Sequence, residues 1–216
     1  MKKIIIRLLN KRTISAALGL GLCITLAVSA IAFDRTAGEV KDSLLRLHII
    51  ANSDSETDQQ LKIKVRDRLL KEGKLFLGDS ENLDRAKQAA EQSLDELAWA
   101  AEDELRKNGC DLNVSASLTK AEFDTRTYGS VTLPAGEYDA LQVIIGEGKG
   151  KNWWCVMFPP MCVSAGCQVQ SDGDSLKDVL SEDGAELVSG GEKYKVKFKA
   201  AEIYETVRST LVRLFG

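Results

Sequence analysis

Residues 138–158 read YDALQVIIGEGKGKNWWCVMF, and this stretch decides the fold expected for the chain. Its two ends, 138–145 and 153–158, are apolar runs rich in β-branched and aromatic residues, a composition typical of strands. The joint between them, 146–152, contains three glycines, which suit a tight and mobile connection. The pattern therefore predicts a β-hairpin of two neighbouring antiparallel strands.

Three further segments have the pattern of strands. The run LLRLHIIA at 44–51 is short, apolar and β-branched, and it ends at the polar turn 52–54. Residues 112–123 begin with alternating apolar and polar side chains, as expected of a half-exposed strand. Residues 128–133 form a shorter extended piece that ends at the turn 134–136.

Helices are expected where apolar residues recur every three or four positions. One such segment, 56–72, follows Ser55, and Asp58 completes a capping box with that serine. A second helix is expected at 83–107 and a last one at 198–214.

Between the strands and the last helix, residues 171–191 are rich in glycine, serine and acidic residues. This segment is expected to be a solvated loop, with a short helix at 175–181 as the alternative. Together the elements favour an α+β fold with an antiparallel sheet, two N-terminal helices and a C-terminal helix. The sequence predicts one such domain at 33–216, preceded by a signal or transmembrane segment at 1–32.

The amino terminus determines the compartment. Five basic residues precede TISAALGLGLCITLAVSAIAF at 13–33, which is 21 residues without a charge. This pattern is typical of an export signal, and 30–32 (Ala-Ile-Ala) supplies the small residues of a cleavage site. The run is also long enough to span a bilayer, so a cleaved signal and a retained anchor both remain open. In either form the chain contacts the membrane through residues 13–33, and everything from Asp34 onward is exported.

Charge and composition exclude several classes of function. Taking the five basic residues of the signal from the net charge of −3 leaves −8 on residues 33–216, which argues against nucleic-acid binding. His48 is the only histidine and no CxxC motif occurs, so neither a metal site nor a cofactor is expected. The segment GEGKGK at 146–151 lacks the spacing of a phosphate-binding loop and precedes a strand.

The exported part contains four cysteines, at positions 110, 155, 162 and 167. An even number outside the cytoplasm favours disulfides, with small buried thiols as an equal alternative. The two prolines at 159–160 form a turn that would bring Cys155 and Cys162 within bridging distance. We therefore predict a disulfide between Cys155 and Cys162.

Two dense segments carry a family resemblance. The phrases RLHIIANSDSETDQQLKIKVRD at 46–67 and GEGKGKNWWCVMFPPMC at 146–162 resemble the hallmark runs of stage II sporulation protein R of endospore-forming Firmicutes. The resemblance covers residues 44–163, and Cys155 and Cys162 fit the family's tryptophan-cysteine and proline-cysteine pattern. It implies no set of catalytic residues.

The resemblance implies an intercellular signal. Such a protein is made in the forespore and exported into the space between the forespore and mother-cell membranes. There it activates a membrane-embedded aspartic protease, stage II sporulation protein GA, which removes the pro-sequence of sigma-E. An exported acidic domain without an enzyme motif fits a ligand that acts by binding, so no catalytic residue is expected.

The surface for such a partner is expected near the glycine-rich joint, where two lysines stand beside two tryptophans. Aromatic side chains commonly anchor interfaces. Adjacent side chains on a strand face opposite ways, so one of the two tryptophans is expected to face the partner and the other the core. The predicted members of this surface are Lys149, Lys151, Asn152, Trp153, Trp154 and His48.

Two other classes of protein share the export signal. A cell-envelope hydrolase would use His48 with a cysteine or a carboxylate, although nothing in the sequence places these groups together. A histidine inside an apolar strand is more often structural. A purely structural envelope protein would share the composition but would not explain the two dense segments.

Overall fold

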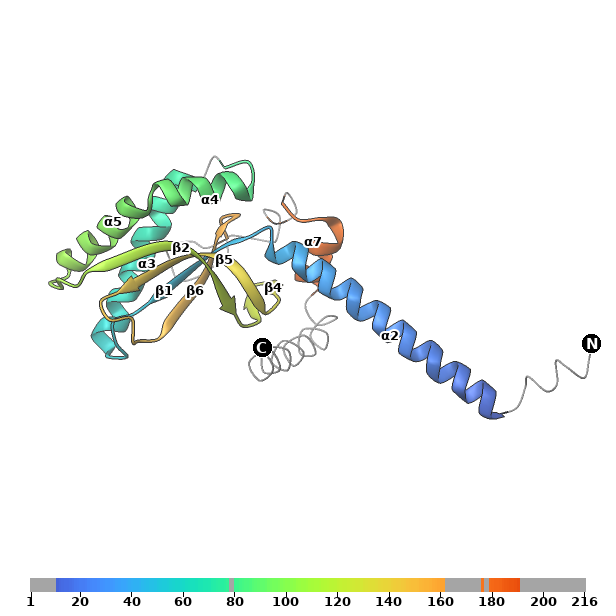
Figure 1. Ribbon diagram of the computed structural model, residues 1–216. Coiled ribbons are helices and arrows are strands. Elements are labelled where there is room, and N and C mark those ends of the chain that lie inside the picture. Colours follow the sequence, from blue (N-terminus) through green and yellow to red (C-terminus); the bar gives the residue numbers. More distant parts are fainter. Residues whose placement is uncertain (1–10, 78–79, 162–175, 177–178, 191–216) are drawn as a thin grey trace, which may run out of the picture.

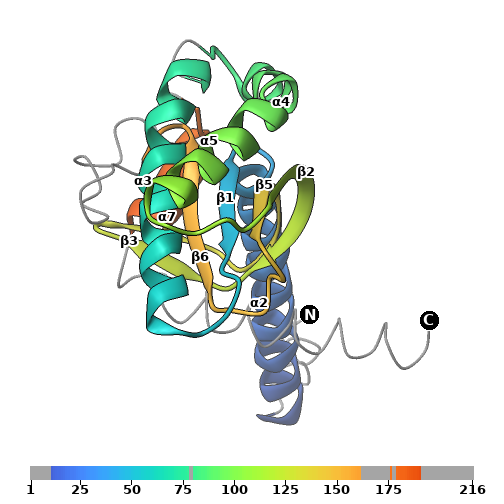
Figure 2. The ribbon, with the colours of Figure 1, turned by 90° about the vertical axis from the view of Figure 1, so that its left-hand side faces the viewer.

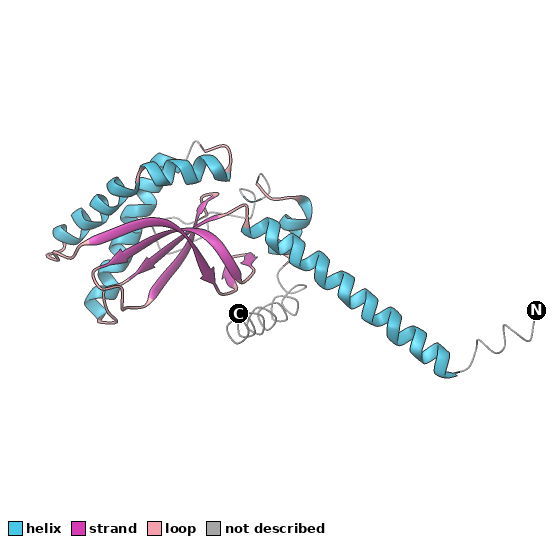
Figure 3. Ribbon diagram, viewed as in Figure 1, coloured by secondary structure: helices cyan, strands magenta, loops and turns pink. Residues whose placement is uncertain are grey.

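The computed structural model describes residues 11–77, 80–161, 176 and 179–190 (Figure 1). In chain order its elements are α2 (Lys11–Lys41), β1 (Leu45–Ile50), α3 (Glu56–Leu77), α4 (Leu83–Gln92), α5 (Leu94–Lys107), β2 (Val114–Phe123), β3 (Arg126–Tyr128), β4 (Val131–Leu133), β5 (Gly136–Ile145), β6 (Asn152–Phe158) and α7 (Glu182–Ser189). Helices α3, α4 and α5 lie together on one face of the main sheet (Figures 2 and 3). The α+β class is confirmed.

The main sheet has four strands in the order β2-β5-β1-β6. β1 pairs in parallel with β5 and antiparallel with β6, while β2 pairs antiparallel with β5. The sheet is therefore mixed, and the expectation of a wholly antiparallel sheet is corrected by its central pair.

The predicted hairpin is wrong in its pairing, although both of its strands form. β1 lies between β5 and β6, so the joint 146–152 passes across the end of β1 instead of turning tightly. β1 takes this position because five of its six residues are buried. A strand that is buried on both faces belongs in the interior of a sheet that is covered on both faces.

The predicted helix 83–107 is two helices that meet at Ser93. The Ser93 N–H donates to the carbonyl of Ala90 at 3.1 Å, so the last turn of α4 is tighter than an α-helical turn. The break lets α4 and α5 each bury a separate apolar stripe, with Ala86 on one and Leu97 on the other. Three helices, rather than two, therefore follow β1. At the end of α5, Gly109 has a positive φ, the conformation in which glycine commonly ends a helix.

The opposite face of the sheet has its own core at one end. There the last turns of α2, the two-stranded sheet β3-β4 and α7 pack on the strands. The buried members include Val40, Leu133, Tyr138, Val156 and Leu187. The extended piece predicted at 128–133 is the turn and second strand of this small sheet.

Helix α7 occupies part of the segment predicted to be a loop. Ser181 caps it by accepting a hydrogen bond from the Gly184 N–H at 3.1 Å, and Leu187 and Val188 are buried. The apolar side of this short helix was hidden in the sequence by its many acidic and small residues. The predicted helix at 198–214 lies outside the described residues, as do residues 175, 177 and 178 of the segment 175–181.

Helix α2 is continuous through the predicted boundary between residues 32 and 33. The part Thr13–Lys41 is long and apolar enough to cross a membrane, and its apolar side chains up to Ile31 are exposed. Burial begins at the half-buried Phe33 and is complete at Ala37 and Val40, which pack on the domain. The same helix is therefore membrane-length at one end and part of the core at the other (Figure 1).

Candidate partner-binding face

A row of four side chains crosses the second face of the sheet beyond this core. Ser117, Gln142, His48 and Trp154 stand in register on β2, β5, β1 and β6. Ser117 is exposed, Gln142 and Trp154 are half-buried, and His48 is 6% exposed. Helices α3, α4 and α5 all lie on the other face of the sheet, so none of these three helices covers the row (Figure 2).

Phe123, at the end of β2, is the centre of an aromatic cluster next to this row. Its ring centroid lies 4.6 Å from that of Trp154, 5.5 Å from Tyr138 and 6.2 Å from His48. His48 and Trp154 stack with their centroids 3.8 Å apart and their planes at 19°. Stacked and edge-to-face pairs are favourable aromatic geometries, so the cluster fixes the orientation of the Trp154 indole.

The surroundings of His48 favour its neutral form. Its Nδ1 lies 3.2 Å from the side-chain nitrogen of Gln142, which donates to it, and this assignment leaves the ring proton on Nε2. Burial lowers the pKa of His48 from its usual 6.5, and the Asn152 side chain opposes that shift. Nε2 is buried and makes no hydrogen bond within the part of the chain that the structure describes.

We expect the stability of this protein to fall as the pH drops below about 6.5, with His48 as a cause. Because burial lowers the pKa of His48 in the folded state, the unfolded chain takes up the proton first, and protonation favours unfolding. His48→Gln should reduce the slope of unfolding free energy against pH between about 6.5 and the lowered folded pKa. Urea unfolding at several pH values measures it.

Since His48 is the only histidine, no second imidazole can account for this slope. Asp58→Asn is the matched control, because its pKa is also lowered but a carboxylate contributes to the slope only at more acidic pH. An unchanged slope in a folded His48→Gln protein would contradict the assignment.

Arg46 lies two residues before His48 on the same face of β1 and is fully buried. Its guanidinium carbon stands 3.9 Å from the ring centroid of Phe123, 4.8 Å from Tyr138 and 5.7 Å from Tyr128. Nη2 donates to the Tyr128 hydroxyl at 2.5 Å, and burial lowers the pKa of Arg46. The signal in the sequence that points to Arg46 is a charged residue inside an otherwise apolar strand.

The joint 146–152 is held by the turn that follows β1. Four backbone N–H groups of the joint donate to that turn, namely those of Glu147 to Asn52 Oδ1 (3.0 Å), Lys149 to Asn52 O (3.1 Å), Gly150 to Ala51 O (2.8 Å) and Lys151 to Asp54 Oδ1 (2.7 Å). The joint is therefore a fixed connection and not the mobile loop that its glycines suggested. The two dense sequence segments therefore contact each other here, through backbone N–H groups of the joint and acceptors of the turn.

Asp58, in the first turn of α3, orders the same turn. Its carboxylate accepts hydrogen bonds from Asn52 Nδ2 at 2.9 Å and Ser53 Oγ at 2.6 Å, which lower the pKa of Asp58. The Asp58 N–H donates to Ser55 Oγ at 3.1 Å, so the predicted cap by Ser55 is confirmed. The acidic residues after β1 thus have a structural role in the connection between the two segments.

The two adjacent tryptophans face opposite sides of the sheet. Trp153 lies on the helix side, where the guanidinium carbon of Arg66 stands 4.4 Å from its ring centroid. Trp154 lies on the other side, stacked on His48. Of the two, Trp154 is therefore the candidate for contact with a partner at this face.

The predicted surface residues fall into two groups. His48, Asn152 and Trp154 come together on the sheet face, with Asn152 exposed at the start of β6. Lys149 and Lys151 are exposed on the joint, where Lys149 forms an ion pair with a neighbouring carboxylate at 2.8 Å. These two lysines lie at the edge of the face rather than on it.

The hydrolase alternative needs a nucleophile beside His48. The side chains that contact or act on the imidazole are those of Gln142, Asn152, Phe123 and Trp154, and none of the four is a nucleophile. Cys155 is disulfide-bonded and belongs to the core on the helix side. Within the described ranges, no three His, Cys, Asp or Glu side chains group as metal ligands would.

One cysteine of the predicted disulfide, Cys155, lies on β6, the strand that also carries Trp154. Cys155 is disulfide-bonded, whereas Cys23 and Cys110 are free. Cys162 and Cys167 lie outside the described residues, so the pairing of Cys155 with Cys162 stays a prediction.

Fold and site together define an α+β domain on a membrane-length helix, with a polar and aromatic sheet face that could receive a partner. The model of the family described as stage II sporulation protein R matches residues 41–167. Stage II sporulation protein R of Bacillus subtilis (strain 168) is 35% identical over 159 residues, 70% of this chain and 71% of that protein. The chain belongs to the stage II sporulation protein R family. No solved structure matches it.

Proposed function

We propose that this protein is an intercellular sporulation signal that acts by binding. It is exported across the forespore membrane into the intermembrane space, where it activates the membrane-embedded aspartic protease that processes pro-sigma-E, stage II sporulation protein GA. Membership of the stage II sporulation protein R family supports the role in sporulation. The membrane-length helix at the amino terminus supports export or anchoring.

The observation that carries the binding mode is the arrangement around Trp154. Its indole is half-buried and held by stacking on His48 and by the edge-to-face contact with Phe123. An aromatic side chain that is already fixed loses little conformational entropy on binding, which is a property of interface anchors. The protein in this proposal carries out no chemistry and changes the conformation of the protease by contact.

We expect Trp154→Ala to lower protease activation by at least about thirtyfold, since truncation of an interface anchor costs about 2 kcal/mol or more of binding free energy. The measurement is co-expression of the full chain with the protease and its pro-sigma factor, scored by removal of the pro-sequence. Circular dichroism of the purified variant establishes that it is folded.

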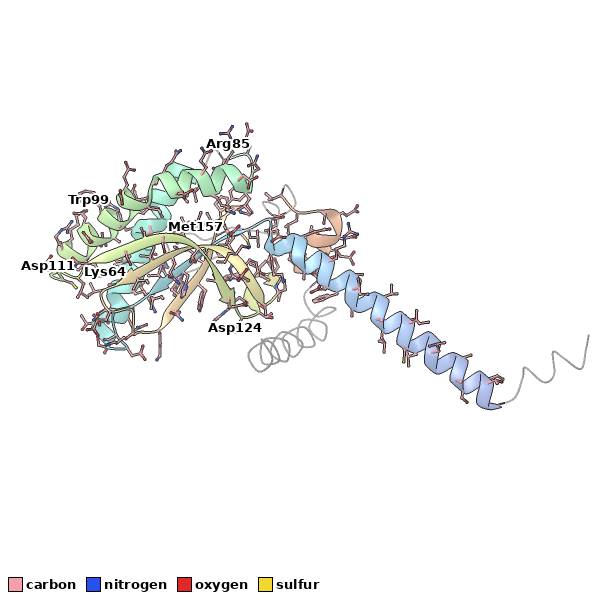
Figure 4. The ribbon with its side chains drawn as sticks, in the orientation of Figure 1. Lys64, Arg85, Trp99, Asp111, Asp124 and Met157 are labelled. Atoms are coloured by element: carbon pink, nitrogen blue, oxygen red, sulfur yellow. The ribbon has the colours of Figure 1, made fainter. Side chains whose placement is uncertain are left out.

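Trp99→Ala is the matched control. Trp99 is 58% exposed on α5, on the helix side of the sheet (Figure 4), so its loss should leave activation unchanged. Asn152→Ala removes an exposed side chain of the proposed surface with little effect on the core, and it should reduce activation in part. Full activation by folded Trp154→Ala and Asn152→Ala proteins would reject binding through this face.

A further inference from the structure

Two buried hydrogen-bond donors on β1 have no partner. Arg46 Nη1 and His48 Nε2 are each inaccessible to solvent, and within the described residues neither has a partner in hydrogen-bond geometry, although the exposed Asn152 side chain also acts on the imidazole. With Gln142 donating to Nδ1, His48 presents an N–H at Nε2, and a guanidinium nitrogen always presents N–H groups. Buried donors are satisfied in most proteins, so two on one strand require an explanation.

Arg46 also lacks a counter-ion. Its neighbours are the rings of Phe123, Tyr128 and Tyr138, and no carboxylate of the described chain pairs with it. The rings and the Tyr128 hydroxyl compensate part of the desolvation of the charge. A buried guanidinium is ordinarily paired with an anion, so the site is set up for one that this chain does not supply.

The two donors lie close enough to bind one group. They are two positions apart on β1, which is about 7 Å along a strand, and both side chains project to the same face. Phe123 contacts both of them, with its centroid 3.9 Å from the guanidinium carbon and 6.2 Å from the imidazole centroid. A carboxylate has two acceptor oxygens, and charge-assisted hydrogen bonds to guanidinium groups are among the strongest in proteins.

The Tyr128 hydroxyl occupies the position beside the Arg46 guanidinium that such a carboxylate would take. It accepts from Arg46 Nη2 at 2.5 Å and donates to the Trp154 carbonyl at 3.4 Å. Tyr128 is carried by β3, which among the strands that the structure describes pairs with the three-residue β4 and not with the main sheet. Val131 and Leu133 of β4 are fully buried in the second core, so an entering group must displace the Tyr128 side chain rather than the small sheet.

We propose that Arg46 and His48 form a binding site for a carboxylate on an acidic side chain of the partner protein, which enters by replacing the Tyr128 hydroxyl. The inference rests on the proposed function for its partner and assigns that partner's chemistry. The carboxylate takes Arg46 Nη1 and Nη2 as donors and His48 Nε2 as a third. Trp154, stacked on His48, contacts the backbone that carries the acidic residue.

The experiment uses the full chain in detergent micelles at pH 7.5, labelled with ¹⁵N-histidine. Because His48 is the only histidine, the ring spectrum contains its two nitrogens and nothing else. The probe is the peptide acetyl-Gly-Glu-Gly-amide, and the control probe is acetyl-Gly-Gln-Gly-amide. We expect a saturable shift of the Nε2 signal with the glutamate peptide, and at least about tenfold weaker binding of the glutamine peptide.

Two variants test the named groups. Arg46→Lys keeps the charge but removes the forked donors, and it should abolish the saturable shift. Tyr128→Phe removes the competing hydroxyl and should tighten binding by severalfold, and it keeps the test decisive even if Arg46→Lys does not fold. Absence of a saturable shift in both the unaltered and the Tyr128→Phe proteins would overturn the proposal, as would equal binding by a folded Arg46→Lys protein.

The outcome is separable from that of the proposed function. If the chain binds the glutamate peptide through Arg46 but does not activate the protease, the carboxylate site stands and the proposed function is rejected. If the chain activates the protease but binds neither peptide, the proposed function stands and the carboxylate site is rejected.

Discussion

Gly150→Ala should lower the free energy of unfolding by about 3 kcal/mol or more. An added β-carbon at this position would collide with the backbone carbonyl of Ser53 and lie 2.9 Å from the Ala51 β-carbon. Neither neighbour can retreat, because the Gly150 N–H donates to the Ala51 carbonyl at 2.8 Å and holds the two segments together. The loss should appear in urea unfolding of the full chain followed by circular dichroism.

Gly38→Ala is the control for this substitution. Gly38 lies inside α2, and nothing stands within 4 Å of the added carbon. The change there should be neutral or should stabilise the helix by up to about 1 kcal/mol. If Gly150→Ala cost no more than about 1 kcal/mol, the close packing of the joint on the turn after β1 would be refuted.

Phe123→Ala should cost about 3 to 5 kcal/mol of folding free energy, the range found for buried phenylalanine truncations. Phe123 is 4% exposed, and its ring contacts His48, Trp154 and Tyr138 and lies under the Arg46 guanidinium. Its removal leaves a cavity and also withdraws one of the rings that compensate the buried charge. Chemical denaturation measures the change.

Trp99→Ala provides the comparison, since it removes a larger aromatic side chain from an exposed helix position. Its cost should stay within about 0.5 kcal/mol, as for ordinary surface substitutions. Similar losses for the two variants would mean that the aromatic cluster does not contribute to the stability of the domain.

The strands were predictable from local pattern, while their order was not. The segments 44–51, 138–145 and 153–158 each have the composition of a buried strand, and each forms one. Two strands separated by a glycine-rich joint suggest a hairpin, yet β1 enters between them. That outcome depends on burial of β1 on both faces, which involves residues almost a hundred positions away along the chain.

Part of the candidate site was also predictable from the local pattern of the sequence. Alternation along a strand required Trp153 and Trp154 to separate, and the structure shows which of them faces the helices. The role of the joint 146–152 was not predictable, because two of its glycines, Gly146 and Gly150, are explained by close approach to the turn after β1. Arg46 was overlooked because its aromatic neighbours come from three other strands, β2, β3 and β5.

The unbroken course of α2 limits how a membrane-bound form of the protein can search for its partner. From Phe33 to Lys41 the helix rises about 13 Å, and no flexible linker separates the apolar part from the domain. With α2 in a bilayer, the sheet face is held at a fixed height above the membrane surface and at a fixed tilt to it. An anchored form can then contact only those partners whose exposed part comes within this fixed reach, a restriction that removal of the helix would lift.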